Sequence, residues 1–155
     1  MLLHAPWAGR DAVEGAFVLD AFAGTGALGL EALSRGAAAA TFIECDAAAL
    51  RALRSNIAAC GAEQRCTVVA GDALDPPTGR RCGLVFLDPP YGQGLIARAL
   101  ERLAARGWVG PETLVVAETG RDEASPGAAP LLAERIYGAA RIGVWRPADN
   151  SRPAR

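Results

Sequence analysis

Short apolar runs alternate along the chain with longer segments in which apolar residues recur every three or four positions. The short runs are rich in β-branched and aromatic residues and lie between breakers, which predicts buried strands. These expected strands cover residues 16–20, 40–45, 66–70, 82–87 and 113–118. The longer segments predict helices from the first strand to about residue 35, over 46–60, and from about 95 to 105, each followed by a glycine.

The order of these elements predicts parallel strand–helix–strand units with right-handed crossovers. One crossover is expected to be a loop or a single turn, because residues 73–81 contain two adjacent prolines. Two strand-like runs near the C-terminus, 132–137 and 140–145, predict an antiparallel hairpin. The expected fold is an α/β domain with a Rossmann-like, doubly wound, mostly parallel sheet and a C-terminal antiparallel hairpin.

The composition agrees with a single domain over residues 1–155, in which 1–15 form an irregular lead-in. Hydrophobic residues make up 51% of the chain and charged residues 21%, so the chain can bury a core and is not expected to be disordered. Acidic residues interrupt every apolar run before it reaches the length of a membrane span. Because the lead-in lacks the regions of a signal peptide, we expect a cytoplasmic protein.

The cysteines are scattered and have apolar neighbours, so they are predicted to be small, reduced core residues. They are Cys45, Cys60, Cys66 and Cys82. Because His4 is the single histidine in the sequence, no metal site is expected.

The charge of the chain argues mildly against a domain that holds nucleic acid mainly by its own basic surface. Its formal net charge is −1, whereas such domains are usually basic. Arg98, Arg102 and Arg106 recur on one helical face, and further arginines gather near the C-terminus. A solvated helix face is favoured over a surface for phosphate contacts.

A glycine-rich segment follows the first strand and opens the first helix. Gly24, Gly26 and Gly29 fit the pattern G-x-G-x-x-G, and Glu44 lies 20 positions after Gly24 at the end of the second strand. This arrangement is typical of sites for dinucleotides or S-adenosylmethionine, in which the acid accepts hydrogen bonds from the ribose hydroxyls. A tight turn that needs glycine for geometry alone remains an alternative.

Two further acids favour S-adenosylmethionine over a dinucleotide. Asp20 ends the first strand, where its charge would oppose a pyrophosphate but suit a cationic α-amino group and a sulfonium. Asp72 follows the third strand, where it could accept a hydrogen bond from an adenine amino group. For Asp72 alone, a turn acid or helix cap is nearly as good an explanation. With Glu44, these acids form a row at the ends of successive strands.

The fourth strand leads into Asp88, Pro89, Pro90 and Tyr91. In open parallel sheets, ligands bind at the carboxyl ends of the strands, which is where this tetrapeptide is expected. A β-turn that closes the strand is the alternative explanation. The similar tripeptide that begins at Asp75 follows no such strand and is expected to be a loop.

Together, these segments resemble class I S-adenosylmethionine-dependent methyltransferases that act on amino groups. The segments are 20–26, 42–44, 71–72 and 88–91. Residues 23–37 resemble more narrowly the RsmD family, which methylates the N2 amino group of a guanine in small-subunit ribosomal RNA. The resemblance covers about residues 16–146 and implies the class I methyltransferase fold.

The resemblance also implies the residues and partners of the site. It places the cofactor at Asp20, Phe22, Gly24, Gly26, Glu44, Asp72 and Ala73. It places catalysis at Asp88, Pro89, Pro90 and Tyr91. The implied cofactor is S-adenosylmethionine, with S-adenosylhomocysteine as the product and no metal. The implied partner is small-subunit rRNA or an assembling small ribosomal subunit, without a membrane, and a monomer is favoured.

The chemistry of a guanine amine explains why such residues are needed. The lone pair of this nitrogen is delocalised into the ring, and acceptors on both of its N–H groups localise it. The Asp88 carboxylate and the Pro89 carbonyl are the candidate acceptors, and Asp88 could also take the departing proton. Tyr91 offers a face for stacking a flipped base. Methyl transfer then depends mainly on positioning.

Members of this family carry a basic stretch before the first strand, which helps to hold RNA. Residues 1–15 contain one arginine, Arg10. We therefore expect either that the chain is truncated or shortened at its start, or that RNA contacts come from elsewhere.

Three other functions remain open at this stage. The first is another amino methyltransferase, acting on adenine N6 or on a protein glutamine, although the glutamine enzymes usually have Asn where Asp88 stands. The second is a nicotinamide-dependent dehydrogenase, which the glycine pattern and Glu44 would also suit. The third is a cofactor-binding module without catalysis.

Overall fold

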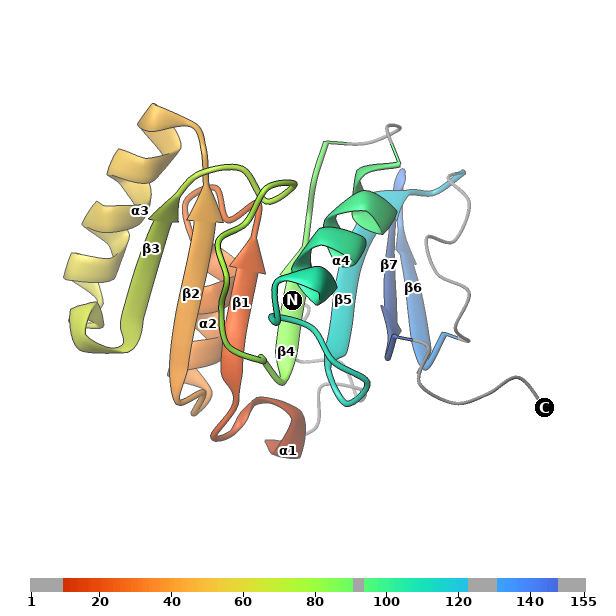
Figure 1. Ribbon diagram of the computed structural model, residues 1–155, viewed down its shortest axis with the longest axis horizontal. Coiled ribbons are helices and arrows are strands. Elements are labelled where there is room, and N and C mark those ends of the chain that lie inside the picture. The colour runs from red at the N-terminus through yellow and green to blue at the C-terminus, as the bar shows by residue number, and fades with distance from the viewer. Residues whose placement is uncertain (1–9, 91–93, 123–130, 148–155) are drawn as a thin grey trace.

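A single mixed sheet forms the centre of the computed structural model, which describes residues 10–90, 94–122 and 131–147 (Figure 1). The strands are β1 (Phe17–Ala21), β2 (Ala39–Glu44), β3 (Cys66–Ala70), β4 (Leu84–Leu87), β5 (Leu114–Gly120), β6 (Ala133–Tyr137) and β7 (Ala140–Trp145). Their order in this described sheet is β3-β2-β1-β4-β5-β7-β6. Strands β1 to β5 pair in parallel, whereas β7 is antiparallel to β5 and to β6. The predicted parallel sheet and terminal hairpin are confirmed.

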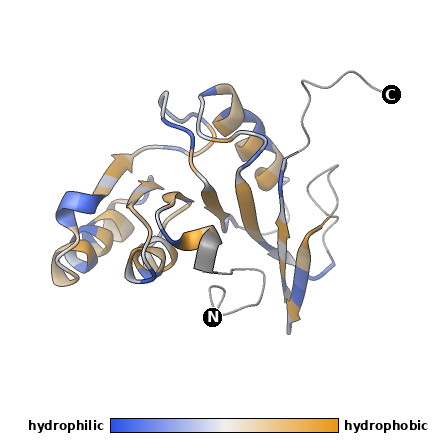
Figure 2. Ribbon diagram, turned by 90° about the horizontal axis from the view of Figure 1, so that it is seen from below, coloured by the Kyte–Doolittle hydropathy of each residue, from blue (hydrophilic) through white to orange (hydrophobic). Residues whose placement is uncertain are grey.

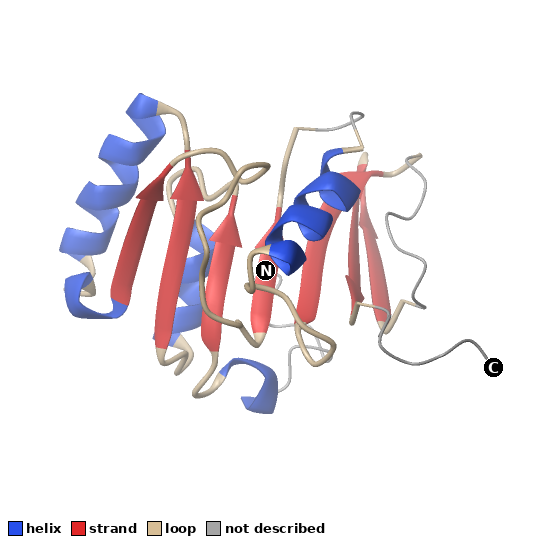
Figure 3. Ribbon diagram, in the orientation of Figure 1, coloured by secondary structure: helices blue, strands red, loops and turns tan. Residues whose placement is uncertain are grey.

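Helices cover both faces of the sheet (Figure 3). They are α1 (Arg10–Val13), α2 (Ala27–Ser34), α3 (Ala47–Ala59) and α4 (Leu95–Ala105), with a 3₁₀ turn at Glu63–Arg65. Side chains of α2 and α3 share one apolar cluster with Phe42 and Phe86 of the sheet. Side chains of α4 share a second cluster with Val85, Val115 and Trp108. The two clusters on opposite faces make the domain doubly wound, and Figure 2 shows the apolar strands between them.

The helix ends follow the expected local chemistry. Asp46 caps α3, because its carboxylate accepts a hydrogen bond from the Ala49 backbone N–H at 2.8 Å. Gly61 then ends this segment with a φ of 63°, which a glycine adopts without steric cost. In α4, Ile96, Ala99 and Leu103 are buried. The arginines at 98, 102 and 106 are exposed, as expected of a solvated face.

The crossover between β3 and β4 contains no helix, as predicted. It is held to the segment after α4 instead: the Trp108 indole N–H donates to the Pro77 carbonyl at 2.8 Å, and the Gly79 N–H donates to the Arg106 carbonyl at 3.0 Å. Trp108 is 5% exposed. These bonds satisfy backbone groups that a crossover helix would otherwise have satisfied.

Three expectations need correction. The lead-in is not wholly irregular, because α1 forms at its end and buries Val13. Strand β5 extends to Gly120 rather than to Glu118, since its last residues pair with β7. The prediction that all four cysteines are core residues is wrong, because Cys45 and Cys60 are exposed and only Cys82 is buried. Both exposed cysteines lie just past the end of an element, where apolar sequence neighbours do not imply burial.

No helix in the described part of the chain combines the length and apolar character needed to cross a membrane.

Candidate active site

The carboxyl ends of β1, β2, β3 and β4 meet at one edge of the sheet. In the parallel register, Ala21 lies beside both Ile43 and Leu87, and Glu44 lies beside Ala70. The residues that follow these positions therefore converge, although they are far apart in the sequence. This register explains why acids at the ends of different strands can share one site.

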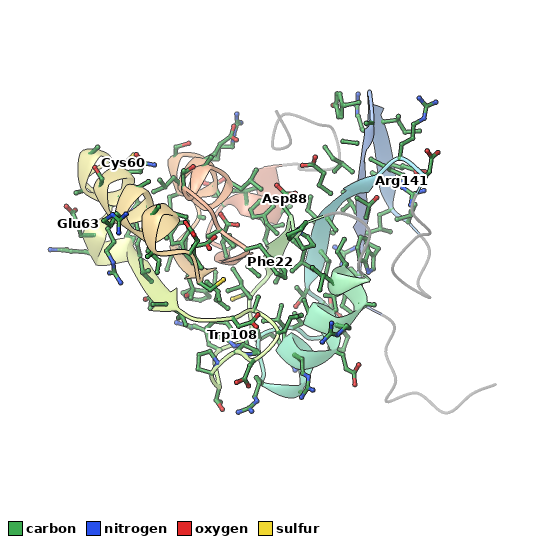
Figure 4. The ribbon with its side chains drawn as sticks, turned by 90° about the horizontal axis from the view of Figure 1, so that it is seen from above. Phe22, Cys60, Glu63, Asp88, Trp108 and Arg141 are labelled. Carbon is green, nitrogen blue, oxygen red and sulfur yellow. The ribbon has the colours of Figure 1, made fainter. Side chains whose placement is uncertain are left out.

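A pocket of about 250 Å³ lies at this edge. It is lined by Phe22, Ile43, Glu44, Cys45, Gly71, Asp72, Ala73, Asp88 and Pro90. The pocket therefore joins four of the predicted cofactor residues to two of the predicted catalytic residues. Figure 4 shows Phe22 and Asp88 reaching this region from β1 and β4.

Several predicted site residues do not line this pocket. Asp20, Gly24, Gly26 and Pro89 lie outside its lining, and Tyr91 lies outside the described residues. Conversely, Ile43, Cys45 and Gly71 line the pocket but were not predicted. Ile43 and Gly71 belong to the segments 42–44 and 71–72 that carry the family resemblance, and Cys45 directly follows Glu44.

Glu44 fixes the glycine loop beside the pocket. One carboxylate oxygen accepts the Gly24 N–H at 2.7 Å. The other accepts the N–H groups of Cys45 at 2.9 Å and Asp46 at 2.8 Å. A carboxylate has about four acceptor positions, so three are in use and a ribose diol would have to share Glu44 with the backbone.

The three glycines have different roles. A Cβ on Gly24 would have no atom within 4 Å, although its φ of 57° favours glycine. A Cβ on Gly26 would instead overlap Leu53, and one on Gly29 would overlap the Phe42 ring. Internal packing thus accounts for Gly26 and Gly29, whereas the tight-turn alternative accounts for the positive φ of Gly24 and Gly26. A Cβ on Gly24 would enter open space.

Asp20 is a buried acid beneath the glycine loop. It is 3% exposed, and its carboxylate accepts the Gly29 N–H at 3.0 Å. Burial raises the pKa of Asp20 to about 7; the Gly29 hydrogen bond lowers it, and the charges of Asp88 and Glu44 raise it further. A nearby cation would relieve this unfavourable charge.

We expect Asp20→Asn to stabilise the ligand-free protein at high pH. Because the folded-state pKa of Asp20 lies above its unfolded value, the folded protein holds the extra proton between about pH 4 and 7. Stability is therefore lost as the pH rises through this range, and Asn avoids the loss. At pH 8 the free energy of unfolding of the variant should exceed that of wild type by roughly 4 kcal/mol, and at pH 4 the two should differ little.

Urea unfolding at several pH values measures this difference. Asn can still accept the Gly29 N–H, so the helix contact is kept. Asp75→Asn is the matched control, because Asp75 is exposed; its free energy of unfolding should equal that of wild type at every pH. A constant difference between Asp20→Asn and wild type at all pH values would contradict the expectation.

Asp88 stands at the end of a strand in which all four residues are buried. Its own side chain is exposed, yet the surrounding protein partly removes it from water. Burial, followed by the charge of Glu118, raises its pKa to about 6. Such a carboxylate is charged at neutral pH and is a better proton acceptor than an ordinary aspartate.

Asp72 and Phe22 complete the rim. Asp72 is exposed and accepts the Leu74 N–H at 2.8 Å, so it is a turn acid and also lines the pocket.

Phe22 has a φ of 64° and is the non-glycine residue with positive φ among those described. This conformation is unfavourable for a bulky side chain and is typical of functional sites. The Ala23 N–H helps to hold it by donating to the Ile43 carbonyl at 2.9 Å.

Comparison with known proteins identifies the family. The family described as Conserved hypothetical protein 95 matches residues 6–146. The solved structure of yhhF from Escherichia coli superposes with a TM-score of 0.83 at 34% identity, covering 96% of this chain and 83% of that one. The chain belongs to the RsmD family.

Two curated relatives of this RsmD-family chain are named ribosomal RNA small subunit methyltransferase D. The protein from Escherichia coli K12 is 41% identical over 110 residues, which cover 70% of this chain and 55% of the relative. The protein from Haemophilus influenzae is 38% identical over 111 residues, covering 68% and 57%. The chain thus spans about half the length of these curated relatives. Its fold is the class I methyltransferase fold expected of the RsmD family.

Proposed function

We propose that this chain transfers a methyl group from S-adenosylmethionine to the N2 amino group of a guanine in small-subunit rRNA. The observation that carries the proposal is that Asp88 and Pro90 share one pocket with Glu44 and Asp72. We further propose that the protein acts as a monomer on rRNA or on an assembling small subunit, in the cytoplasm. The names of its relatives support an RNA substrate.

The residues of the pocket fit S-adenosylmethionine. Glu44 and Asp72 supply acceptors for hydroxyl and amino groups, and Phe22, Ile43 and Ala73 supply an apolar lining. The open space beside Gly24 would be filled by a Cβ. Asp20 adds a buried carboxyl group, whose charged form would suit a cationic ligand and oppose a pyrophosphate. When bound, the cofactor would supply an electrophilic methyl group on its sulfonium.

The chain's own residues would then orient the amine and receive its proton. The Asp88 carboxylate would accept one N–H, and the Pro89 carbonyl would accept the other, so that the nitrogen lone pair is localised for attack. Pro89 and Pro90 fix the backbone and lack N–H groups that could compete for these acceptors. Asp88 would take the proton that the methylated amine loses.

Transfer of tritium from labelled S-adenosylmethionine to unmethylated small ribosomal subunits tests the proposal. We expect one modified guanine, which mass spectrometry of the digested rRNA would locate. Transfer only to DNA adenine or to protein would favour another amino methyltransferase. Calorimetry with S-adenosylmethionine and NAD tests the dehydrogenase alternative, and tight binding of NAD alone would refute the proposed cofactor.

The pH dependence of the reaction should report the ionisation of Asp88. Its pKa is raised to about 6, and only the carboxylate can accept the proton. At a saturating concentration of S-adenosylmethionine, at which the ionisation of Asp20 does not limit cofactor binding, we expect kcat/KM for rRNA to rise as the pH increases through about 6 and then to level off. Asp88→Asn should remove this rise. A rise that persists in the variant would assign the ionisation to another group.

A further inference from the structure

Glu118 lies next to Asp88 at the edge of the sheet. Strands β4 and β5 pair in parallel with Leu87 beside Ala117, so Asp88 and Glu118 are the next residues along the two strands. Strand β5 continues past this point and pairs Glu118 with Ile142 of β7, which fixes the Glu118 backbone. The side chain is half-buried. The charge of Glu118 also raises the pKa of Asp88, after the effect of burial.

Two neighbouring carboxylates repel each other unless donors lie between them. A ligand with two adjacent N–H donors would relieve this repulsion. Among the nucleobases that carry an exocyclic amine, guanine presents the N1–H beside the N2 amino group. Adenine and cytosine instead present an unprotonated ring nitrogen beside their amines, and its lone pair would face the second carboxylate.

We propose that Glu118 selects guanine by accepting its N1–H while Asp88 accepts an N–H of the N2 amine. This inference rests on the proposed function and assigns it a residue that determines specificity. This role would explain why an acid stands at position 118 beside Asp88, where an apolar or neutral residue would avoid the repulsion between two carboxylates. A site built to bind a donor strongly rejects an analogue that lacks it.

The test compares RNA substrates that differ at one hydrogen-bond donor. The substrates are small ribosomal subunits reconstituted with guanine or with 2-aminopurine at the methylated position. 2-Aminopurine keeps the exocyclic amine but has no N1–H. We expect wild type to prefer guanine by at least about tenfold in kcat/KM, as the loss of a charged hydrogen bond predicts.

Glu118→Gln should reduce this preference by about tenfold or more, because a glutamine amide can donate to the bare N1 of 2-aminopurine. Glu112→Gln is the matched control: Glu112 is exposed and lies before the opposite end of β5. This control should keep the wild-type preference. If Glu118 had only a structural role, Glu118→Gln would lower the rates for guanine and for 2-aminopurine together and leave their ratio unchanged.

The outcomes separate this inference from the proposed function. Methylation of guanine by wild type, with an unchanged preference in Glu118→Gln, would overturn the role of Glu118 alone. If wild type methylates neither base at any rRNA position, the proposed function falls and this inference falls with it. A reduced preference in Glu118→Gln and a normal one in Glu112→Gln would support both.

Discussion

Asp88→Ala is expected to lower methyl transfer to rRNA by about 100- to 10,000-fold, the usual contribution of a positioned acid or base. The variant leaves the amine without its charged acceptor and without a group to take its proton. Asp88→Asn keeps a neutral acceptor, so its rate of methyl transfer should lie between those of Asp88→Ala and wild type. Binding of S-adenosylmethionine, measured by calorimetry, should change little, because Glu44 and Asp72 remain in the pocket.

The chain contains its own control for this prediction. Asp75, Pro76 and Pro77 repeat the first three residues of the proposed catalytic tetrapeptide, 88–91, but they lie in the crossover loop and outside the pocket lining. Asp75 is exposed, and its Oδ1 lies 3.9 Å from Nη2 of Arg106. Such a surface ion pair contributes little to stability. Asp75→Ala should therefore retain activity, and full activity in Asp88→Ala would refute the mechanism.

Gly26→Ala is expected to cause the largest loss of stability among single methyl additions to the glycine loop. Gly26 has a φ of 85°, and its new Cβ would overlap Leu53, which is fully buried. The backbone strain costs about 1–2 kcal/mol and the overpacking about 1–3 kcal/mol. A total of about 2–5 kcal/mol is a large part of the 5–15 kcal/mol that stabilises a typical domain.

Urea unfolding of the ligand-free protein measures this loss without contributions from binding. Gly61→Ala is the control, because Gly61 has a φ of 63° and a Cβ there would meet nothing within 4 Å. The loss of stability in Gly61→Ala should therefore reflect only the backbone strain of a positive φ. Equal losses in the two variants would mean that Leu53 and Phe42 can move aside, contrary to the packing argument.

The sequence predicted the sheet well because its signals are local. Strand β3, helix α4 and strand β7 match their predicted ranges, and Asp46 caps α3 as expected. The exact position of the hairpin was less predictable, because β7 rather than β6 lies beside β5. That choice depends on pairing between distant segments, which no short pattern encodes.

Six of the predicted site residues line one pocket, but the contacts that these residues make inside the protein were not predicted. The resemblance placed the cofactor at Gly24 and Gly26, whereas a Cβ on Gly26 would overlap Leu53 inside the protein. Glu44 was expected to bind a ribose, yet it already holds the glycine loop. Both facts depend on side chains that meet only in the folded protein. The role of Tyr91 stays a prediction.

The position of β4 also determines how the site responds to local unfolding. Strand β4 lies at the centre of the described sheet, with three strands on each side. Its amide hydrogens should therefore exchange with solvent mainly through global unfolding, whereas those of the outermost strand β6 can exchange through fraying of the edge. Opening at either edge would leave the support of Asp88 intact, but opening at β3, the other edge strand, would displace Asp72 and Ala73. The Asp88 side of the pocket should therefore be more durable than the Asp72 side.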